Sequence, residues 1–394
     1  MNRSSLVIGA TLFLTACGTV KSTSQLPLDK LDYSIQDAPD WTALFNRQHG
    51  WFGGDGIFAI PLNGKENAAP TDTTKNLIWF SDSMLGDVVD GKPKNQKMVN
   101  NTVAILTGDK PDNNRIRFYW DETDEGPKSL FIPNTASSEK GDYYWLGDGF
   151  RNEKKDGTIY IFAYRMHNED SKDDWSFRQR GLNLIKIPKG SQPPFKDQQQ
   201  IETPFMFKGE TSKEDGSFGS GIFVNTKQAG ALNPDGYVYI YGVKGADKGL
   251  VAARVKPEAI EDFASWRFWD GKKWNESVDQ TAIIVPHVSN ELSVSPLKDG
   301  RFLLIFQEGG MGNTVAMRIG ASPVGPFGSP IRIYESEDTK SNKNYFGYNA
   351  KAHPSLSKEG ELLISYNVNS FDFWNEIQKN PTLYRPRFFK MIIK

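Results

Sequence analysis

Short hydrophobic runs recur along the chain from about residue 31, and turn residues separate them. They are rich in Ile, Val, Leu, Tyr and Phe, which is typical of β-strands. Most of the runs follow an Asp-Gly or Glu-Gly dipeptide, which is a signal for a tight turn. We therefore expect each run to be the second strand of a β-hairpin. The runs are residues 77–80, 158–163, 237–241, 301–306 and 361–366.

The strand before each of these turns carries a polar residue among small or hydrophobic ones. One such residue per unit gives separations of 93, 72, 71 and 62 residues. A unit of about 70 residues repeated five times is the sequence mark of a β-propeller. We predict an all-β fold, a single five-bladed β-propeller over residues 31–394, with a jelly roll or sandwich as the alternative. The five polar residues are Asp55, Asp148, Ser220, Glu291 and His353.

Helices are expected to be scarce. Residues 256–263 begin with Lys-Pro-Glu and predict one short helix with proline in its first turn. Residues 41–48 are expected to add a closing strand to the last blade, whose C-terminal strand would be residues 387–393. Such closure would hide the edge strands that otherwise promote aggregation.

Composition excludes several classes of protein. The 394 residues carry 47 Lys and Arg against 48 Asp and Glu, a formal net charge of −1. A nucleic-acid binder normally has a basic face, so this balance argues against one. With 38% hydrophobic and 24% charged residues, the chain has enough apolar residues to form a core.

Residues 1–17 have the features of a lipoprotein signal. Arg3 supplies a positive charge, residues 6–14 are mostly apolar, and a small-residue cleavage site ends on Cys17, the only cysteine. We expect residues 1–16 to be removed and Cys17 to be lipidated; an ordinary secretory signal is the alternative. The apolar stretch is shorter than the ~20 residues that span a bilayer. Residues 17–30 are expected to be a flexible linker, which predicts lipid anchoring to the bacterial cell envelope, at the outer membrane.

Three carboxylates on the expected innermost strands are the candidate catalytic residues: Asp55, Asp148 and Glu291. Small residues flank each of them and would let a ligand approach. Hydrolysis of a glycosidic bond needs one protonated and one ionised carboxyl group, and a third carboxylate can separate their pKa values by charge repulsion. The alternative is that these side chains are structural. Taken singly, each carboxylate is better explained as a structural residue. The repeating spacing of the three favours a catalytic role for the set.

Weaker candidates would bind substrate rather than react with it. Aromatic rings can stack on sugar faces, although most Trp residues in β-rich proteins belong to the core. Amide and cationic side chains suit sugar hydroxyls, although Asn is also a turn residue. The candidate binding residues are Trp51, Asp82, Asn101, Trp145, Arg151, Asn349 and His353.

Several motifs together resemble the five-bladed propeller glycosidases, the arabinanase, xylosidase and invertase-like enzymes. They are Trp51 to Gly56, Trp79 to Ser83, Tyr144 to Gly149, Ser289 to Ser293, and a Ser-Pro-Val-Gly-Pro-Phe turn at 322–327. More closely, residues from about 40 to 394 resemble a bacterial lipoprotein family known as domain of unknown function 5005. That family is related to domain of unknown function 4185, which includes endo-D-arabinanases.

The resemblance implies a role for each carboxylate. Asp55 would be the nucleophile or base, Asp148 the residue that sets its partner's pKa or a second catalytic group, and Glu291 the acid. In the arabinanase pattern the acid is a Glu on the third blade, where this chain has Ser220. Glu291 would therefore act from the fourth blade, and Asp82 is an alternative second catalytic residue.

Other chemistries lack their motifs. The four His residues are far apart and no HExxH motif occurs, so no metal site is predicted; a structural calcium in the channel stays open. No glycine-rich loop for a nucleotide is present, and no cofactor is expected. We predict a monomeric carbohydrate-active lipoprotein that hydrolyses a carbohydrate polymer such as an arabinofuranose glycan. The alternative is a non-catalytic glycan-binding or scaffolding lipoprotein, whose carboxylates would be neutralised by cations such as Lys351.

Overall fold

The computed structural model describes residues 26–169 and 176–394. The predicted signal peptide, Cys17 and most of the predicted linker lie outside the described residues. The last linker residues do not follow the expectation of free chain, because Arg301 donates hydrogen bonds to the carbonyls of Pro27 (2.5 Å) and Lys30 (2.7 Å). Of the helices in the described ranges, none is both long and apolar enough to cross a membrane.

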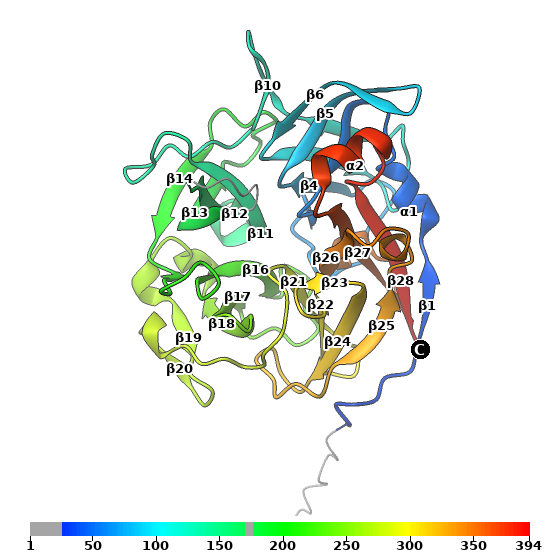
Figure 1. Cartoon of the computed structure of the whole chain (residues 1–394). Helices are drawn as coiled ribbons and strands as arrows, with labels where there is room; N and C mark the ends of the chain where they lie inside the picture. Colours follow the sequence, from blue (N-terminus) through cyan, green and yellow to red (C-terminus); the bar gives the residue numbers. More distant parts are fainter. Residues whose placement is uncertain (1–25, 170–175) are drawn as a thin grey trace, which may run out of the picture.

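The fold is all-β, as predicted, and curled sheets surround a common centre (Figure 1). Five of these sheets have four to six strands each. The first contains β3 (Phe58–Pro61), β4 (Lys75–Phe80), β7 (Thr102–Thr107) and β8 (Ile116–Tyr119). The second contains β11 (Tyr143–Asn152), β12 (Thr158–Asn168), β13 (Phe177–Ile187) and β14 (Gln199–Thr203). The third contains β15 (Met206–Phe207), β16 (Gly216–Asn225), β17 (Tyr237–Lys244), β18 (Gly249–Val255), β19 (Arg267–Trp269) and β20 (Trp274–Asn275).

The fourth sheet contains β21 (Leu292–Pro296), β22 (Phe302–Gln307), β24 (Thr314–Gly320) and β25 (Ile331–Glu335). The fifth contains β23 (Met311–Gly312), β26 (Tyr345–Ala352), β27 (Glu361–Ser370), β28 (Pro386–Ile393) and β1 (Tyr33–Asp37). Two smaller sheets pair β2 (His49–Gly54) with β5 (Ser83–Val89) and β6 (Lys92–Val99), and β9 (Asp121–Thr123) with β10 (Gly126–Lys128). The helices are α1 (Pro39–Leu44), α2 (Phe373–Lys379) and short 3-10 turns, η1 (Glu153–Lys155), η2 (Pro257–Ala259), η3 (Phe263–Ser265), η4 (Val278–Gln280), η5 (Asp338–Lys340) and η6 (Pro354–Leu356).

The five hydrophobic runs form β4, β12, β17, β22 and β27, and each pairs antiparallel with the strand before it, as predicted. The closing strand was wrongly placed. Residues 39–44 form α1 because Pro39 starts the first turn and Trp41 and Leu44 bury one helical face. β1 closes the fifth sheet instead, with Tyr33 opposite Ile393 of β28. The helix expected at 256–263 is reduced to two 3-10 turns, η2 and η3.

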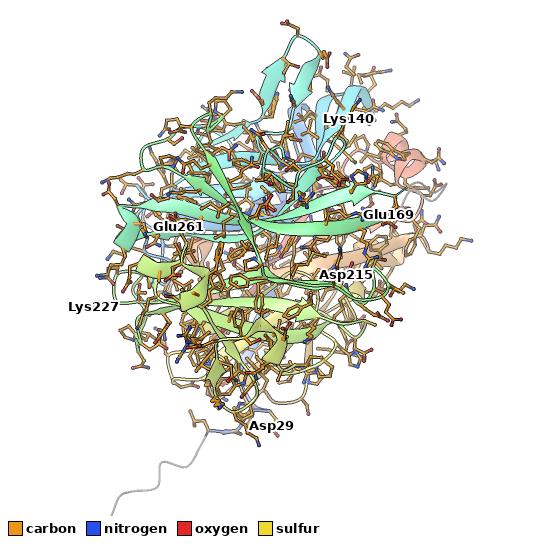
Figure 2. All side chains as sticks on the ribbon, turned by 90° about the vertical axis from the view of Figure 1, so that its left-hand side faces the viewer. Asp29, Lys140, Glu169, Asp215, Lys227 and Glu261 are labelled. Carbon is orange, nitrogen blue, oxygen red and sulfur yellow. The ribbon has the colours of Figure 1, made fainter. Side chains whose placement is uncertain are left out.

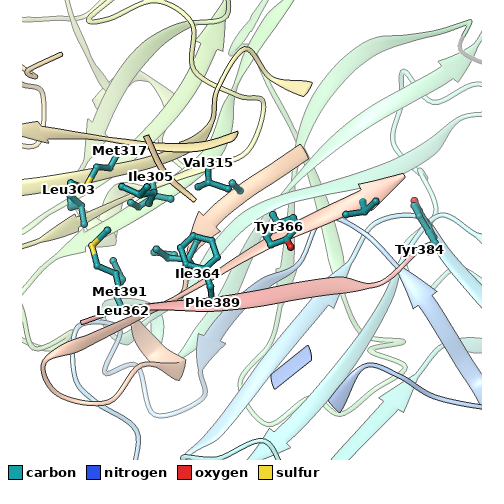
Figure 3. Close-up of a cluster of buried hydrophobic side chains, with 14 of the residues drawn as sticks. Leu303, Ile305, Val315, Met317, Leu362, Ile364, Tyr366, Tyr384, Phe389 and Met391 are labelled. Atoms are coloured by element: carbon teal, nitrogen blue, oxygen red, sulfur yellow. The ribbon is translucent and has the colours of Figure 1, made fainter. Parts of the chain in front are cut away.

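The hydrophobic core lies between neighbouring sheets. In Figure 3, Leu303, Ile305 and Met317 of the fourth sheet pack toward Ile364 and Met391 of the fifth. These side chains are buried. Because each sheet packs its faces against its neighbours, the polar residues of the innermost strands are left to face the centre.

Three innermost strands carry a β-bulge at the same place. Pairing slips between Leu146 and Gly149 in β11, between Phe218 and Gly221 in β16, and between Tyr348 and Lys351 in β26. A bulge adds an unpaired residue and redirects its side chain. In β11 the bulge contains Asp148, so the local geometry places this carboxylate where the sheets meet.

The sheets are arranged around an axis, which we call the channel, and its two ends can be told apart in a side view. Figure 2 shows Glu169 and Asp215 toward one face and Glu261 and Lys227 toward the other. Asp215 precedes β16 and Lys227 follows it, so β16 runs from the first face to the second. We call the face at which β11 and β16 begin the mouth.

Candidate active site

Asp55 lies where the chain leaves one sheet for another. β2 ends at Gly54 and β3 begins at Phe58. The backbone N–H of Asp55 donates to the carbonyl of Asp82 (3.1 Å), and the N–H of Ser81 donates to the carbonyl of Asp55 (2.8 Å). These bonds hold Asp55 beside Asp82, although 27 positions separate them in the sequence.

Gly56 makes room for a third carboxylate. Its φ is +60°, and a Cβ at this position would lie 2.9 Å from Ser81 Oγ and 3.2 Å from Glu291 Oε1. Only glycine adopts this backbone region without strain. The side chain of Glu291 therefore reaches the turn that carries Asp55.

Asp55 is held by tyrosine hydroxyls. Tyr348 Oη donates to Asp55 Oδ2 at 2.7 Å, and the hydroxyl of Tyr384 also stabilises the ionised carboxylate. Burial nevertheless raises the pKa of Asp55, with the tyrosines and the charge of Lys351 opposing that effect. The two hydroxyl donors make Asp55 the better placed member of the Asp55–Asp82 pair to carry the negative charge.

Asp82 has the properties of a group that holds a proton. Burial, and then the charge of Asp55, raise its pKa to about 7. Asn100 Nδ2 donates to Asp82 Oδ1 at 3.0 Å. The indole of Trp145 also favours the ionised form, although its N–H is not in hydrogen-bonding geometry with the carboxyl. A pKa near 7 leaves Asp82 protonated in a substantial fraction of molecules at neutral pH.

Glu291 and Lys351 form a buried ion pair deeper in the channel, with the Glu291 side chain 10% exposed and that of Lys351 2%. Burial raises the pKa of Glu291 to about 7; Lys351 opposes this rise, and the charges of Asp55 and Asp148 add to it. Lys351 also lies 4.4 Å from the centre of the Phe58 ring, a cation–π contact.

Asp148 accepts two backbone hydrogen bonds, one from the N–H of Gly149 beside it (2.8 Å) and one from the N–H of Ile222 on β16 of the neighbouring sheet (2.6 Å). Burial outweighs these bonds and the charge of Lys351, so the pKa of Asp148 is raised to about 7. The three predicted carboxylates, Asp55, Asp148 and Glu291, are therefore brought together around a single cation, Lys351.

Below this layer the channel holds a cavity of about 60 Å³, lined by Asp148, Lys351, His353 and Glu66 among others. Burial raises the pKa of Glu66 well above its ordinary value, and the charge of Asp148 adds to the rise. Asn67, the next residue, donates to the carbonyl of Val224 at 2.9 Å and so fixes the connection between β3 and β4 beneath the channel. Within the described ranges, no group of three or more His, Cys, Asp and Glu residues is arranged to hold a metal ion.

Comparison with protein families assigns the chain to one of them. The family model for a domain of unknown function, DUF5005, matches residues 38–392. The chain belongs to the DUF5005 family. Among curated proteins no relative matches it.

One solved structure is similar to the DUF5005 chain over nearly its whole length. It is that of a candidate hydrolase from Bacteroides ovatus, with a TM-score of 0.67 and 17% identity, covering 93% of this chain and 97% of the other. A protein of unknown function from Dyadobacter fermentans has a TM-score of 0.45 and 9% identity, covering 93% and 99%. An endo-arabinase from Bacteroides thetaiotaomicron has a TM-score of 0.42 and 16% identity, covering 86% and 98%.

Two residues expected to bind substrate belong to the core of the DUF5005 fold instead. Trp51 is 1% exposed and its ring stacks on Phe118 with centroids 4.7 Å apart, so no sugar can reach it. Asn101 is fully buried, and its amide donates to the carbonyls of Phe131 (2.8 Å) and Tyr144 (3.1 Å). Both expectations are therefore wrong. The ring of Trp51 packs in the core, and the amide of Asn101 is used in hydrogen bonds to backbone carbonyls.

Two further predicted binding residues lie away from the mouth. His353 is 2% exposed and bonds Ser365 Oγ at 2.7 Å; burial lowers its pKa well below the ordinary value. Arg151 forms an ion pair with Glu153, and its backbone N–H donates to Glu66. It lies six residues after Trp145 on β11, about 20 Å along the strand. Neither can contact a sugar bound at Asp55 and Asp82.

Asp82, Trp145 and Asn349 are the predicted binding residues that the fold places near the carboxylates. Trp145 lies beside Asp82, and Asn349 sits in the bulge of β26 with φ +59°. Tyr348, Tyr384 and Glu66 were missed. Tyr348 directly precedes the bulge of β26, the position that the core residue Leu146 takes before the bulge of β11, so its place in the repeat gave no functional signal.

Proposed function

We propose that this protein is a glycoside hydrolase in which Asp82 is the general acid and Asp55 the base or nucleophile. One observation carries the proposal: the two residues are adjacent, yet tyrosine hydroxyls favour a negative Asp55 while burial and that charge favour a protonated Asp82. Glycosidic hydrolysis uses such a pair, one carboxyl donating a proton to the leaving oxygen and the other attacking or activating water.

This assignment moves the acid from Glu291 to Asp82. Lys351 neutralises Glu291, and both are buried, whereas Asp55 and Asp82 are partly exposed. Substrate would reach Asp82 before Glu291. We propose that Asp148, Glu291 and Lys351 do not contact the reacting atoms. They set the electrostatic potential in which Asp82 donates its proton and Asp55 attacks the sugar or activates water.

The fold supports a hydrolase without naming its substrate. The Bacteroides ovatus structure, whose description is that of a candidate hydrolase, shares the fold over 93% of this chain. We propose that the five larger sheets are the blades of a five-bladed propeller with the site on its axis, and that the substrate is a carbohydrate polymer. The suggested kinship with endo-D-arabinanases makes arabinofuranose polymers the first to test. The reaction as proposed needs only carboxyl groups and water.

A non-catalytic glycan-binding role is the second candidate. In such a protein the carboxylates would be neutralised by nearby cations, and Lys351 pairs with Glu291 in this way. In either role, we propose a monomer anchored through lipidated Cys17 to the outer membrane of a bacterial envelope. Mass spectrometry of the membrane fraction would detect the acyl chains, and Cys17→Ser would release the protein to the soluble fraction.

The test is product release from a polysaccharide panel that includes arabinan, galactan and xylan. Asp55→Asn and Asp82→Asn are each expected to lower the rate about 10²- to 10⁴-fold, as loss of an acid or base does. Asp90→Asn, an exposed carboxylate on the β5–β6 turn, is the matched control and should retain the rate. Equal release by all four proteins, or none by the wild type, would remove the hydrolase and leave the binding role.

A further inference from the structure

Three exposed apolar side chains lie around the mouth and have no place in the mechanism above. Phe371 is 60% exposed, Met311 57% and Trp374 50%. Large apolar side chains at this exposure are unusual in a cluster, and such clusters mark binding surfaces. Met311 belongs to β23 of the fifth sheet, Phe371 lies in the turn between β27 and α2, and Trp374 lies on α2; Figure 1 shows β23 and α2 close to the centre of the ring of sheets.

Phe371 is connected to Asp55 through a line of aromatic rings. Its ring centre lies 4.6 Å from that of Phe346, which lies 5.6 Å from that of Tyr348. The hydroxyl of Tyr348 in turn donates a hydrogen bond to Asp55. The N–H of Phe371 donates to the carbonyl of Asn344 (3.0 Å), so the backbone beside β26 fixes its position.

Trp374 is connected to the same carboxylate by a second line. Its ring meets that of Phe373 edge-on, with centroids 5.0 Å apart, and Phe373 meets Tyr384 in the same way at 5.0 Å. Tyr384 is the other tyrosine that stabilises Asp55. Ile377, one turn further along α2, is buried and anchors the helix, while Trp374 is 50% exposed.

Met311 completes the set from the side of the channel. It pairs with Tyr348 across the β23–β26 edge, so its side chain projects next to the residue that holds Asp55. Polar groups accompany the apolar ones. Asn349 follows Tyr348, and within residues 26–169 and 176–394 its side chain makes no hydrogen bond. A surface with apolar rings and an available amide matches the two kinds of face that a sugar presents.

We propose that Phe371, Trp374 and Met311 form a stacking wall that binds the sugar units of a glycan chain as it leaves the Asp55–Asp82 pair. The ligand is a polymeric glycan with exposed C–H faces, since aromatic rings bind such faces by stacking while amides bind the hydroxyls. The wall begins at the tyrosines that hold Asp55, so the sugar units bound there would be contiguous with the unit at the carboxyl pair. The inference rests on the proposed function for the identity of the site, and it predicts that the protein prefers long chains to mono- and disaccharides.

The test separates binding from hydrolysis by using Asp55→Asn protein, which is expected not to consume its ligand. Affinity electrophoresis in gels that contain arabinan, galactan or xylan would measure the dissociation constant for each polymer. Adding Phe371→Ala or Trp374→Ala to Asp55→Asn should weaken binding of the preferred polymer about fivefold to tenfold, the equivalent of one lost aromatic contact. Adding Leu232→Ala, which removes a 58% exposed apolar side chain from the β16–β17 connection, should change nothing.

The outcomes distinguish the wall from the reaction. One outcome is that Asp55→Asn protein binds a polymer, the ring variants lose that binding, and the wild type hydrolyses nothing. This outcome would support the stacking wall and refute the hydrolase. If the ring variants bind every polymer as tightly as Asp55→Asn alone, the wall is refuted, whatever the activity. Absence of binding to the whole panel, or equal affinity for a monosaccharide and its polymer, would also refute it and would favour a protein partner on this surface.

Discussion

Replacing Lys351 with Met tests the electrostatics of the channel directly. The substitution keeps the length of the side chain and removes the cation that pairs with Glu291. Glu291 would then be a carboxylate in a site that leaves its side chain 10% exposed, with Asp55 and Asp148 still nearby. Removing one partner of a buried ion pair costs about 3–5 kcal/mol, because the remaining charge has no compensation.

The cost should depend on pH in a definite direction. The pKa of Glu291 is raised in the folded protein to about 7, against 4.5 for an ordinary Glu, and loss of Lys351 raises it further. A group whose pKa is raised by folding stabilises the protein below its unfolded pKa and loses that contribution as the pH rises through the folded pKa. We therefore expect the full cost at pH 8 and a markedly smaller one at pH 5.5, where Glu291 takes up a proton.

Urea unfolding followed by tryptophan fluorescence at the two pH values would measure the cost. The double variant Lys351→Met, Glu291→Gln is the control, because it removes both charges and should recover most of the stability at pH 8. Equal destabilisation at pH 5.5 and pH 8, or a double variant as unstable as the single one, would show that Lys351 acts through packing and that the buried-charge argument is wrong.

Two further predictions concern the same region. The wild type should itself lose stability as the pH rises from 5 to 8, because Asp82, Asp148 and Glu291 all have a pKa raised to about 7; thermal unfolding would measure this, and a rise in Tm over that range would contradict it. Gly56→Ala should cost about 1–2 kcal/mol for its backbone at φ +60° and should also displace Glu291, which a Cβ would approach to 3.2 Å. Gly91→Ala is the control, because Gly91 has φ +71° and a Cβ there would have nothing within 4 Å, so only the backbone is strained. The two variants should therefore differ in stability and in the pH dependence of unfolding. Identical behaviour would exclude the contact between the new Cβ at position 56 and Glu291.

The sequence predicted what depends on local pattern. Hydrophobic runs after Asp-Gly and Glu-Gly turns became second strands of hairpins, since alternation and turn chemistry act over a few residues. The spacing of Asp55, Asp148 and Glu291 predicted their convergence, although only Asp148 lies on a strand: Asp55 lies between β2 and β3, and Glu291 directly precedes β21. His353 was a misleading member of that series: the bulge of its unit lies at Asn349 and Ala350, and His353 follows the end of β26.

The rest depends on contacts between distant parts of the chain. Tyr348 and Tyr384 contact Asp55 although they lie 293 and 329 positions after it in the sequence. No local signal marks a tyrosine as the partner of a particular carboxylate. Trp51 was expected to stack on a sugar face, yet strand alternation and the rings of Phe80 and Phe118 place it in the core. Residues 41–48 were expected to form a closing strand, whereas the spacing of Trp41, Leu44 and Phe45 buries one face of a helix turn.

The pairing of β1 with β28 has a consequence for biosynthesis. Because Tyr33 lies opposite Ile393, β1 can acquire its partner only after the residues of β28 have been synthesised. Until then β27 and β1 both present unpaired backbone. The nascent chain therefore needs shielding until β28 has been made, and a chain that stops before β28 would expose two unpaired strand edges, those of β27 and β1.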